Sequence, residues 1–162
     1  MGSRERILAR LKAAHRQPAD HRPLRTVPAM SIGDDIVTHF IRQAEKNGAT
    51  VQRQQREQEV TLDDTAFYTR ATIAVAETGS IGVDSNVAAT HKLYLCDHLY
   101  LGITEHNIVR YLHDALRIAG NTGARAFHLI TGPSRTADVE QTIQIGAHGP
   151  KQLTIMIYRD DS

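Results

Sequence analysis

The order of runs in the second half of the chain constrains the fold more than any other feature. Apolar, β-rich runs alternate there with amphipathic runs of helical period. Strands that alternate with helices are typical of parallel crossovers, in which helices cover the faces of a sheet. We therefore expect an α/β fold with a mainly parallel sheet flanked by helices. The expected strands span 71–83, 92–103, 126–131 and 152–158, and the expected helices span 105–119 and 134–145.

These runs also indicate which residues form the core. Residues 71–76 are apolar on both faces, as in a central strand that is covered on each side. Gly79 interrupts the first β-rich stretch, and the stretch 92–103 predicts one broken strand or two. Gly120 is expected to end the first helix. The residues expected to point inward are Ile108, Leu112, Ala115, Leu116 and Ala119 in the first helix, and Val139 and Ile143 in the second.

The first half of the chain divides at a proline-containing segment. Residues 3–14 favour a short helix, and residues 15–30 hold three of the five prolines, which indicates an extended linker. A stronger helix is predicted from Ser31, with Gly48 just past its end. We therefore expect an N-terminal helix and linker over 1–30 and an α/β domain over 31–162. The helix predicted from Ser31 has an apolar stripe of Ile32, Ile36, Phe40 and Ala44. A short strand is expected over 49–52, and a polar connection over 52–64.

Charge and cysteine content limit the classes of function. The net charge of +1 argues against a general nucleic-acid binder. Residues 1–25 carry seven Lys/Arg and two Asp/Glu, so this basic arm could dock on a partner or a neighbouring copy, or simply form a solvated face. The single cysteine, Cys96, fits a reducing cytosol and cannot ligate an ordinary iron–sulfur cluster. We expect a cytoplasmic protein with no membrane span.

The stretch "TGPSRTADVE" is the first candidate ligand site. Gly132 permits a tight turn, Ser134 or Thr136 can cap the expected helix, and free N–H groups at a helix start can hold an anion. Arg135 adds a cation suited to a carboxylate or phosphate. The alternative is a capped helix in which Arg135 pairs with Asp138 or Glu140.

Two further turns carry candidate residues. In "AETGS", the backbone around Thr78, Gly79 and Ser80 can hold a ligand oxygen while Glu77 acts as a base, nucleophile or orienting acceptor. The alternative is that Glu77 only accepts bonds from nearby N–H groups.

In "GAHGP", His148 stands beside Gly149 in a loop and could act as an acid or base near neutral pH. The alternative for His148 is a solvated loop side chain.

The cluster "HKLYLCDH" raises the question of a metal site. Cys96 and His98 would lie on one face of a strand, with His91 upstream. Zinc requires three or four firmly placed ligands, and no second ligand pair is evident. We therefore predict no metal in this chain and expect one semi-polar sheet face that contains Tyr94, Cys96, His98 and Tyr100.

Taken in order, "AETGS", "GPSRTADVE" and "GAHGP" resemble the LUD domain of the lactate-utilisation protein C family. Residues 71–158 carry the resemblance, and "SRERILARLKAA" is similar to the family's opening helix. The resemblance implies a fold like the NagB/RpiA/CoA-transferase group and a role in oxidising L-lactate to pyruvate beside two iron–sulfur partner proteins, which would carry the clusters. The matching positions are Glu77, Thr78, Gly79, Gly132, Ser134, Arg135, Thr136, Asp138, His148 and Gly149.

The chain departs from this family before residue 71. Only a polar connection lies where family members have a longer segment, so the N-terminal part is shortened and another chain could complete the sheet. We therefore expect a homo-oligomer.

Three functions follow as hypotheses: an accessory subunit that binds an anionic ligand, a stand-alone enzyme for a sugar phosphate or an acyl-CoA, and a structural module. In the first, the three turns meet at the carboxyl edge of the sheet, Arg135 and the helix start bind the anion, and Glu77 and His148 orient it.

Overall fold

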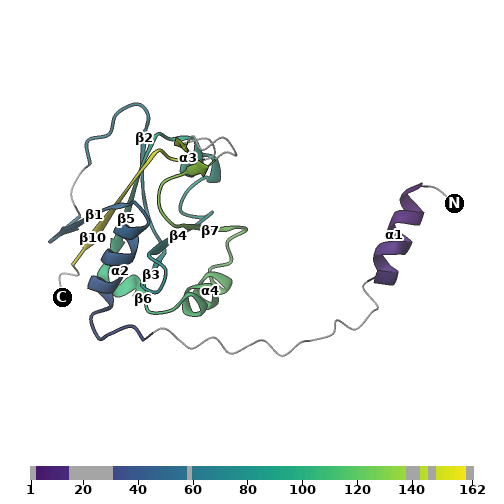
Figure 1. The fold of residues 1–162 in the computed structure, drawn as a ribbon, viewed down its shortest axis with the longest axis horizontal. Helices are drawn as coiled ribbons and strands as arrows, with labels where there is room; N and C mark the ends of the chain where they lie inside the picture. The colour runs from purple at the N-terminus through teal and green to yellow at the C-terminus, as the bar shows by residue number, and fades with distance from the viewer. Residues whose placement is uncertain (1–2, 15–30, 58–59, 138–142, 146–148, 160–162) are drawn as a thin grey trace.

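The fold is that of a computed structural model, which describes residues 3–14, 31–57, 60–137, 143–145 and 149–159. In the described residues, the strands form two four-stranded sheets and one two-stranded sheet, and the helices between residues 36 and 121 lie beside the two larger sheets (Figure 1). The expected α/β class is confirmed, but the expected single sheet is divided into two. This division decides where the candidate residues lie.

The first sheet is parallel throughout and is called sheet A. Its strands lie in the order β1, β10, β5, β2, and all three neighbouring pairs run parallel. Parallel neighbours align their amino ends, so the starts of β1, β10 and β5 form one edge. The bounds are β1 Thr50–Gln54, β10 Gln152–Tyr158, β5 His98–Thr104 and β2 Ala66–Arg70.

The second sheet is mixed and is called sheet B, with strands in the order β6, β3, β4, β7. Gly79 has a φ of +67°, which lets the chain reverse so that β3 and β4 pair antiparallel. The β4–β7 pair is also antiparallel, whereas β3 and β6 are parallel. This reversal separates the 71–83 and 126–131 strands from sheet A. The bounds are β3 Ile73–Val75, β4 Ser80–Asp84, β6 Ile108–Val109 and β7 Phe127–Ile130.

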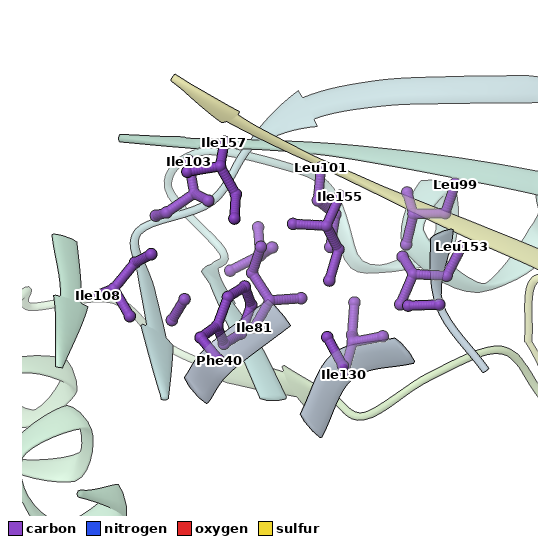
Figure 2. Close-up of a cluster of buried hydrophobic side chains, with 14 of the residues drawn as sticks. Phe40, Ile81, Leu99, Leu101, Ile103, Ile108, Ile130, Leu153, Ile155 and Ile157 are labelled. Atoms are coloured by element: carbon purple, nitrogen blue, oxygen red, sulfur yellow. The ribbon is translucent and has the colours of Figure 1, made fainter. Parts of the chain in front are cut away.

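The main core lies between sheets A and B. Alternate residues of β5 and β10 point to it, as Figure 2 shows for Leu101 and Ile155, and Phe40 of α2 and Ile81 of β4 face them. Burying each such side chain contributes about 1.5–3 kcal/mol to the transfer free energy. The labelled residues of this core are Phe40, Ile81, Leu99, Leu101, Ile103, Ile108, Ile130, Leu153, Ile155 and Ile157.

A second, smaller cluster lies on the opposite face of sheet B. Ile73 and Val75 point there and pack with Ala115 of α4. The central strand predicted at 71–76 is therefore covered on both faces, as expected.

Helix α2, Ile36–Lys46, carries the predicted apolar stripe but begins later than predicted. Asp35 is its N-cap, and the Asp35 side chain accepts a hydrogen bond from the Thr38 N–H at 2.9 Å. The cap therefore sets the start at Ile36 rather than Ser31. Gly48 follows the end with a φ of +92°, which confirms its predicted place.

The predicted helix 105–119 is wrong over its first seven residues, about two turns. Residues 105–107 form a short 3-10 helix, η1 Glu105–Asn107, and Ile108 then pairs with Ala74 in sheet B. Pairing with β3 therefore overrides the local helical period. Helix α4 covers Leu112–Asn121, so Gly120 lies within it and Leu116 is exposed rather than inward.

The expected strand over 92–103 is a helix followed by a strand. Helix α3 covers Thr90–Leu95 and buries Leu93, whereas Leu95 is 80% exposed. Leu93 and Leu95 are two positions apart, so the sequence suggested a strand with both leucines on one face. The prediction was wrong because these residues form a helix that buries only Leu93. Tyr94 and Cys96 therefore do not share a sheet face with His98 and Tyr100.

The predicted helix over 134–145 is contradicted. Residues Arg135–Ala137 form β8 and Ile143–Ile145 form β9, and these two strands pair antiparallel. No helix start follows Ser134. The described residues also include the predicted N-terminal helix as α1, Ser3–Ala14, while the predicted linker 15–30 and Val139 lie outside them.

Candidate functional site

The turns "AETGS" and "TGPS" meet at the carboxyl end of α2. A Cβ added to Gly79 would lie 2.4 Å from the Ala44 backbone nitrogen, and one added to Gly132 would lie 2.3 Å from the Asn47 carbonyl oxygen. Both glycines also have positive φ, +67° and +92°. Each turn can approach the helix this closely only because it has no side chain at that position.

Hydroxyl groups join the same two turns. The Thr78 hydroxyl donates to Ser80 Oγ at 2.7 Å, and Ser80 Oγ lies 2.7 Å from Thr131 Oγ1 at the end of β7. Asn47, the C-cap of α2, donates from Nδ2 to the Thr78 carbonyl at 2.8 Å. These bonds fix the backbone of both turns around the helix end.

The third turn joins the second through its last residues. The Ser134 N–H donates to the Pro150 carbonyl at 2.9 Å, and a Cβ added to Gly149 would lie 3.3 Å from Ser134 Cβ. The described parts of the second and third segments are therefore in contact, and the second also lies with the first against the end of α2. The Ser134 N–H is occupied by this bond, so it does not serve as an anion donor.

The segments meet at the amino edge of sheet A, not at the carboxyl edge that we expected. Pro133 lines a cleft with the first residues of three strands, Thr50 of β1, His98 of β5 and Gln152 of β10. The expectation was wrong because β7, which precedes Pro133, belongs to sheet B and runs antiparallel to β4.

We call this hollow the amino-edge cleft. Its volume is about 170 Å³, which exceeds the room that one water molecule needs. Lys151 is the cation among its lining residues, and hydroxyl groups come from Thr50 and Thr154. The lining residues are Gly48, Thr50, His98, Pro133, Lys151, Gln152, Leu153 and Thr154.

Lys151 is held by an exposed partner. Its Nζ lies 3.0 Å from Oδ1 and from Oδ2 of Asp97, and both side chains are about half exposed. Such surface ion pairs contribute little net free energy, so an anion in the cleft can compete for the ammonium group.

His98 is a second polar side chain that lines the cleft. Its Nε2 lies 2.8 Å from Thr154 Oγ1, and its ring stacks on Tyr100 with 4.0 Å between centroids. Burial lowers the pKa of His98 below 6.5, with Asp63 opposing this shift. The imidazole is therefore neutral at pH 7 and supplies a hydrogen bond rather than a charge.

Glu77 points away from this cleft toward α4. Its Oε2 accepts a hydrogen bond from the Leu112 N–H at 3.0 Å, and its own N–H donates to the Arg110 carbonyl at 3.0 Å. A carboxylate at a helix start also interacts favourably with the helix dipole. The Leu112 N–H is 35 positions away along the chain, so Glu77 neither faces the cleft nor makes only the local bonds of the alternative.

The remaining sequence candidates are placed only in part. Arg135 and Thr136 pair through their backbones with Ile145 and Gln144 in the two-stranded sheet of β8 and β9. The positive helix end that was expected beside Arg135 is absent, because these residues are strand. Asp138 and His148 lie outside the described residues.

The sequence raised metal and membrane questions that the fold addresses. Among the described residues, no group of three or more His, Cys, Asp or Glu side chains is arranged to hold a metal ion. Cys96 ends α3 while His98 begins β5, and burial raises the pKa of the Cys96 thiol. No helix in the described part of the chain is long and apolar enough to cross a bilayer.

Sequence reasoning did not select Lys151, Thr50 or Thr154. Lys151 directly follows "GAHGP", so its position beside a candidate turn was the available signal. The sequence carries no such signal for Thr50 and Thr154, because they are close only through the register of β1 and β10, which pairs them.

Comparison with known proteins gives matches over most of this fold. The family described as the LUD domain matches residues 39–158. Lactate utilization protein C of Bacillus pumilus is 27% identical over 115 residues, which cover 65% of this chain and 48% of that protein. An uncharacterized protein of Neisseria meningitidis is 28% identical over 116 residues, covering 65% and 50%. The chain thus spans about half the length of these curated relatives.

One solved structure supports the architecture. A DUF162 family protein from Deinococcus radiodurans aligns with a TM-score of 0.59 at 14% identity, covering 79% of this chain and 99% of that one. At this identity, the likeness concerns the fold.

Proposed function

Because the chain belongs to the LUD-domain family, we propose that it is an accessory subunit of a system that oxidises L-lactate and that it binds a small anion. Relatives named Lactate utilization protein C support the system. In this proposal the iron–sulfur clusters belong to partner proteins, since one cysteine cannot ligate a cluster. The homo-oligomer expected from the shortened N-terminal part stays a prediction.

One observation carries the anion site: Pro133 of the second family segment and Lys151, which directly follows the third, line one cleft in which Lys151 supplies a cation. The first segment lies nearby, because Gly79 and Gly132 both allow their turns to approach the end of α2. An ammonium group and neighbouring hydroxyls suit a carboxylate or phosphate oxygen. Arg135 remains a candidate for a second cation, on sequence grounds.

The position of Glu77 supports an accessory role over a stand-alone enzyme. The enzyme alternative for a sugar phosphate or acyl-CoA requires a base or nucleophile that can reach the substrate. Glu77 instead accepts from the Leu112 N–H, away from the amino-edge cleft. In our proposal this carboxylate holds the start of α4, and the chain supplies binding and assembly to its partners.

A deletion and rescue experiment tests the accessory role. Cells that lack the chain should lose L-lactate-dependent dye reduction in extracts, and the wild-type chain should restore it. A Lys151→Met chain should restore less, whereas an Arg42→Met chain, altered on the exposed side of α2, should restore it fully. Unchanged dye reduction in the deletion strain would contradict the proposal.

A further inference from the structure

A second and larger cleft lies at the other edge of sheet A. Its volume is about 400 Å³, and it opens where β2 and β5 end at Arg70 and Thr104. In sheets of parallel strands, ligands bind in the crevice beyond the carboxyl ends. We call it the carboxyl-edge cleft. Its polar lining consists of Arg70, Thr72, Asp84, Thr104, His106 and Asn107.

Asp84 provides a rigid acceptor in this cleft. It ends β4 and is only 5% exposed. Its Oδ1 accepts from the N–H groups of Asn86 and Val87, at 2.8 and 3.2 Å, and its Oδ2 accepts from the Thr72 hydroxyl at 3.0 Å. A carboxylate oxygen has two acceptor sites, so Oδ2 keeps one for a donor on a ligand.

Arg70 provides the cation. Its NH1 lies 3.7 Å from Glu57 Oε2, beyond hydrogen-bond distance, and both side chains are substantially exposed. A guanidinium carries five donors in a planar fork that fits a carboxylate. Because the pair with Glu57 is loose, an anion in the cleft can take its place at low cost.

Thr104 adds a donor to the lining of the same cleft. Its Oγ1 accepts a hydrogen bond from Asn107 Nδ2 at 3.0 Å, which leaves the hydroxyl proton to donate. The cleft thus combines a guanidinium and a hydroxyl donor with a buried carboxylate acceptor.

We propose that the carboxyl-edge cleft binds a small carboxylate with a hydrogen-bond donor on the adjacent carbon. The ligand carboxylate pairs with Arg70 and Thr104, and its hydroxyl or ammonium group donates to Asp84 Oδ2. A carboxylate without that donor would face Asp84 with no hydrogen to offer, so it binds more weakly. The site is separate from the amino-edge cleft and does not rest on the function proposed above.

Titration of the isotope-labelled full chain by NMR tests this site, with three ligands of similar size. L-lactate has the adjacent hydroxyl, L-alanine has the adjacent ammonium, and propionate has neither. We expect L-lactate or L-alanine to shift the amide signals of Ala71, Thr104 and Asn107 and to bind about tenfold or more tightly than propionate. The stronger of the two identifies the donor as hydroxyl or ammonium, and either result supports the proposal.

Variants separate this site from the amino-edge cleft. Arg70→Ala should weaken binding about 10- to 100-fold, and Arg70→Lys should weaken it less. Thr104→Val, which keeps the side-chain volume, should weaken it as well. Lys151→Met, at the opposite edge of the sheet, should leave it unchanged. Equal binding of propionate, unchanged binding by Arg70→Ala, or no shift at these amides would overturn the proposal.

Discussion

The carboxylate of Glu77 accepts a hydrogen bond from the backbone N–H of Leu112, across a distance of 3.0 Å. Thirty-five positions separate the two residues along the chain, so the bond ties the turn after β3 to the start of α4. A residue that the sequence suggests for catalysis thus has a structural partner.

The Glu77 bond predicts a stability effect that depends on the acceptor. Glu77→Ala should lower the free energy of unfolding by about 1 kcal/mol, because the Leu112 N–H loses its side-chain acceptor at a helix start. Glu77→Gln should lower it less, since an amide oxygen still accepts. Urea denaturation followed by circular dichroism measures both, with Glu45→Ala on the exposed side of α2 as a control within about 0.5 kcal/mol. Equal losses in the Ala and Gln variants would contradict the proposed bond.

The two turn glycines predict a graded series of alanine variants. Gly79→Ala and Gly132→Ala combine a positive φ with a clash against α2 backbone, so each should cost more than strain alone. Gly123 has the same φ as Gly79, +67°, but nothing lies within 4 Å of an added Cβ. Gly123→Ala should therefore cost about 1–2 kcal/mol, and both others clearly more.

Gly120 completes the series as a control of opposite sign. It lies inside α4 with open space around an added Cβ, so Gly120→Ala should stabilise the fold by about 1 kcal/mol. Thermal unfolding of the four variants gives the order. A Gly79→Ala protein as stable as Gly123→Ala would show that the turn does not approach Ala44.

The core between the sheets predicts a large difference between two leucines. Leu101 of β5 is fully buried, so Leu101→Ala should cost about 2–5 kcal/mol through lost burial and the cavity left behind. Leu95→Ala removes the same atoms from a side chain that is 80% exposed and should cost less than about 0.5 kcal/mol. Urea midpoints at constant slope measure both, and similar losses would mean that α3 is misplaced.

His98 predicts a dependence of stability on pH. Burial depresses its pKa in the folded state below the unfolded value of 6.5, so the unfolded chain binds more protons between the two values. The contribution is therefore fully present above about 6.5 and is lost as the pH falls through the folded pKa. His98→Gln should remove this part of the pH dependence of the melting temperature.

Leu95→Ala is the control, because it changes a side chain that is 80% exposed and has no titratable group. It should leave the pH dependence of the melting temperature unchanged. Direct NMR titration of the His98 ring gives the pKa itself, and a value above 6.5 would contradict the burial that lowers it. Asp35 and Asp63 also have lowered pKa values, from hydrogen bonds to Thr38 and Thr65, but they titrate below about 3.8 and do not overlap this window.

The sequence predicts those elements in which the apolar residues follow one buried face along the whole element. The stripe of Phe40 and Ala44 and the apolar run 152–158 are visible because they face one core along their whole length. Strand β2 was not predicted, since its place beside β5 comes from the sheet. The pairing of Ile108 with Ala74 likewise overrides a helical period that is only local.

None of the described candidate residues that the sequence suggested in the three turns lines the amino-edge cleft, although Ser134 and Gly149 lie close to each other. The edge of sheet A at which these segments lie depends on the reversal at Gly79. That reversal divides the strands between two sheets, and no periodicity carries this information. The helix expected after Ser134 failed because β8 and β9 pair with each other.

The central claim is that a small anion binds in the amino-edge cleft through Lys151. The most direct measurement is titration of the full chain with inorganic phosphate and with L-lactate, followed by NMR amide shifts. The account predicts shifts of the amide signals of Gly48, Thr50 and Gln152. Lys151→Met should weaken this binding about tenfold or more. Arg135→Ala tests whether Arg135 supplies a second cation. Shifts at Gly48, Thr50 and Gln152 that Lys151→Met leaves unchanged, or no shift at these three amides, would contradict it.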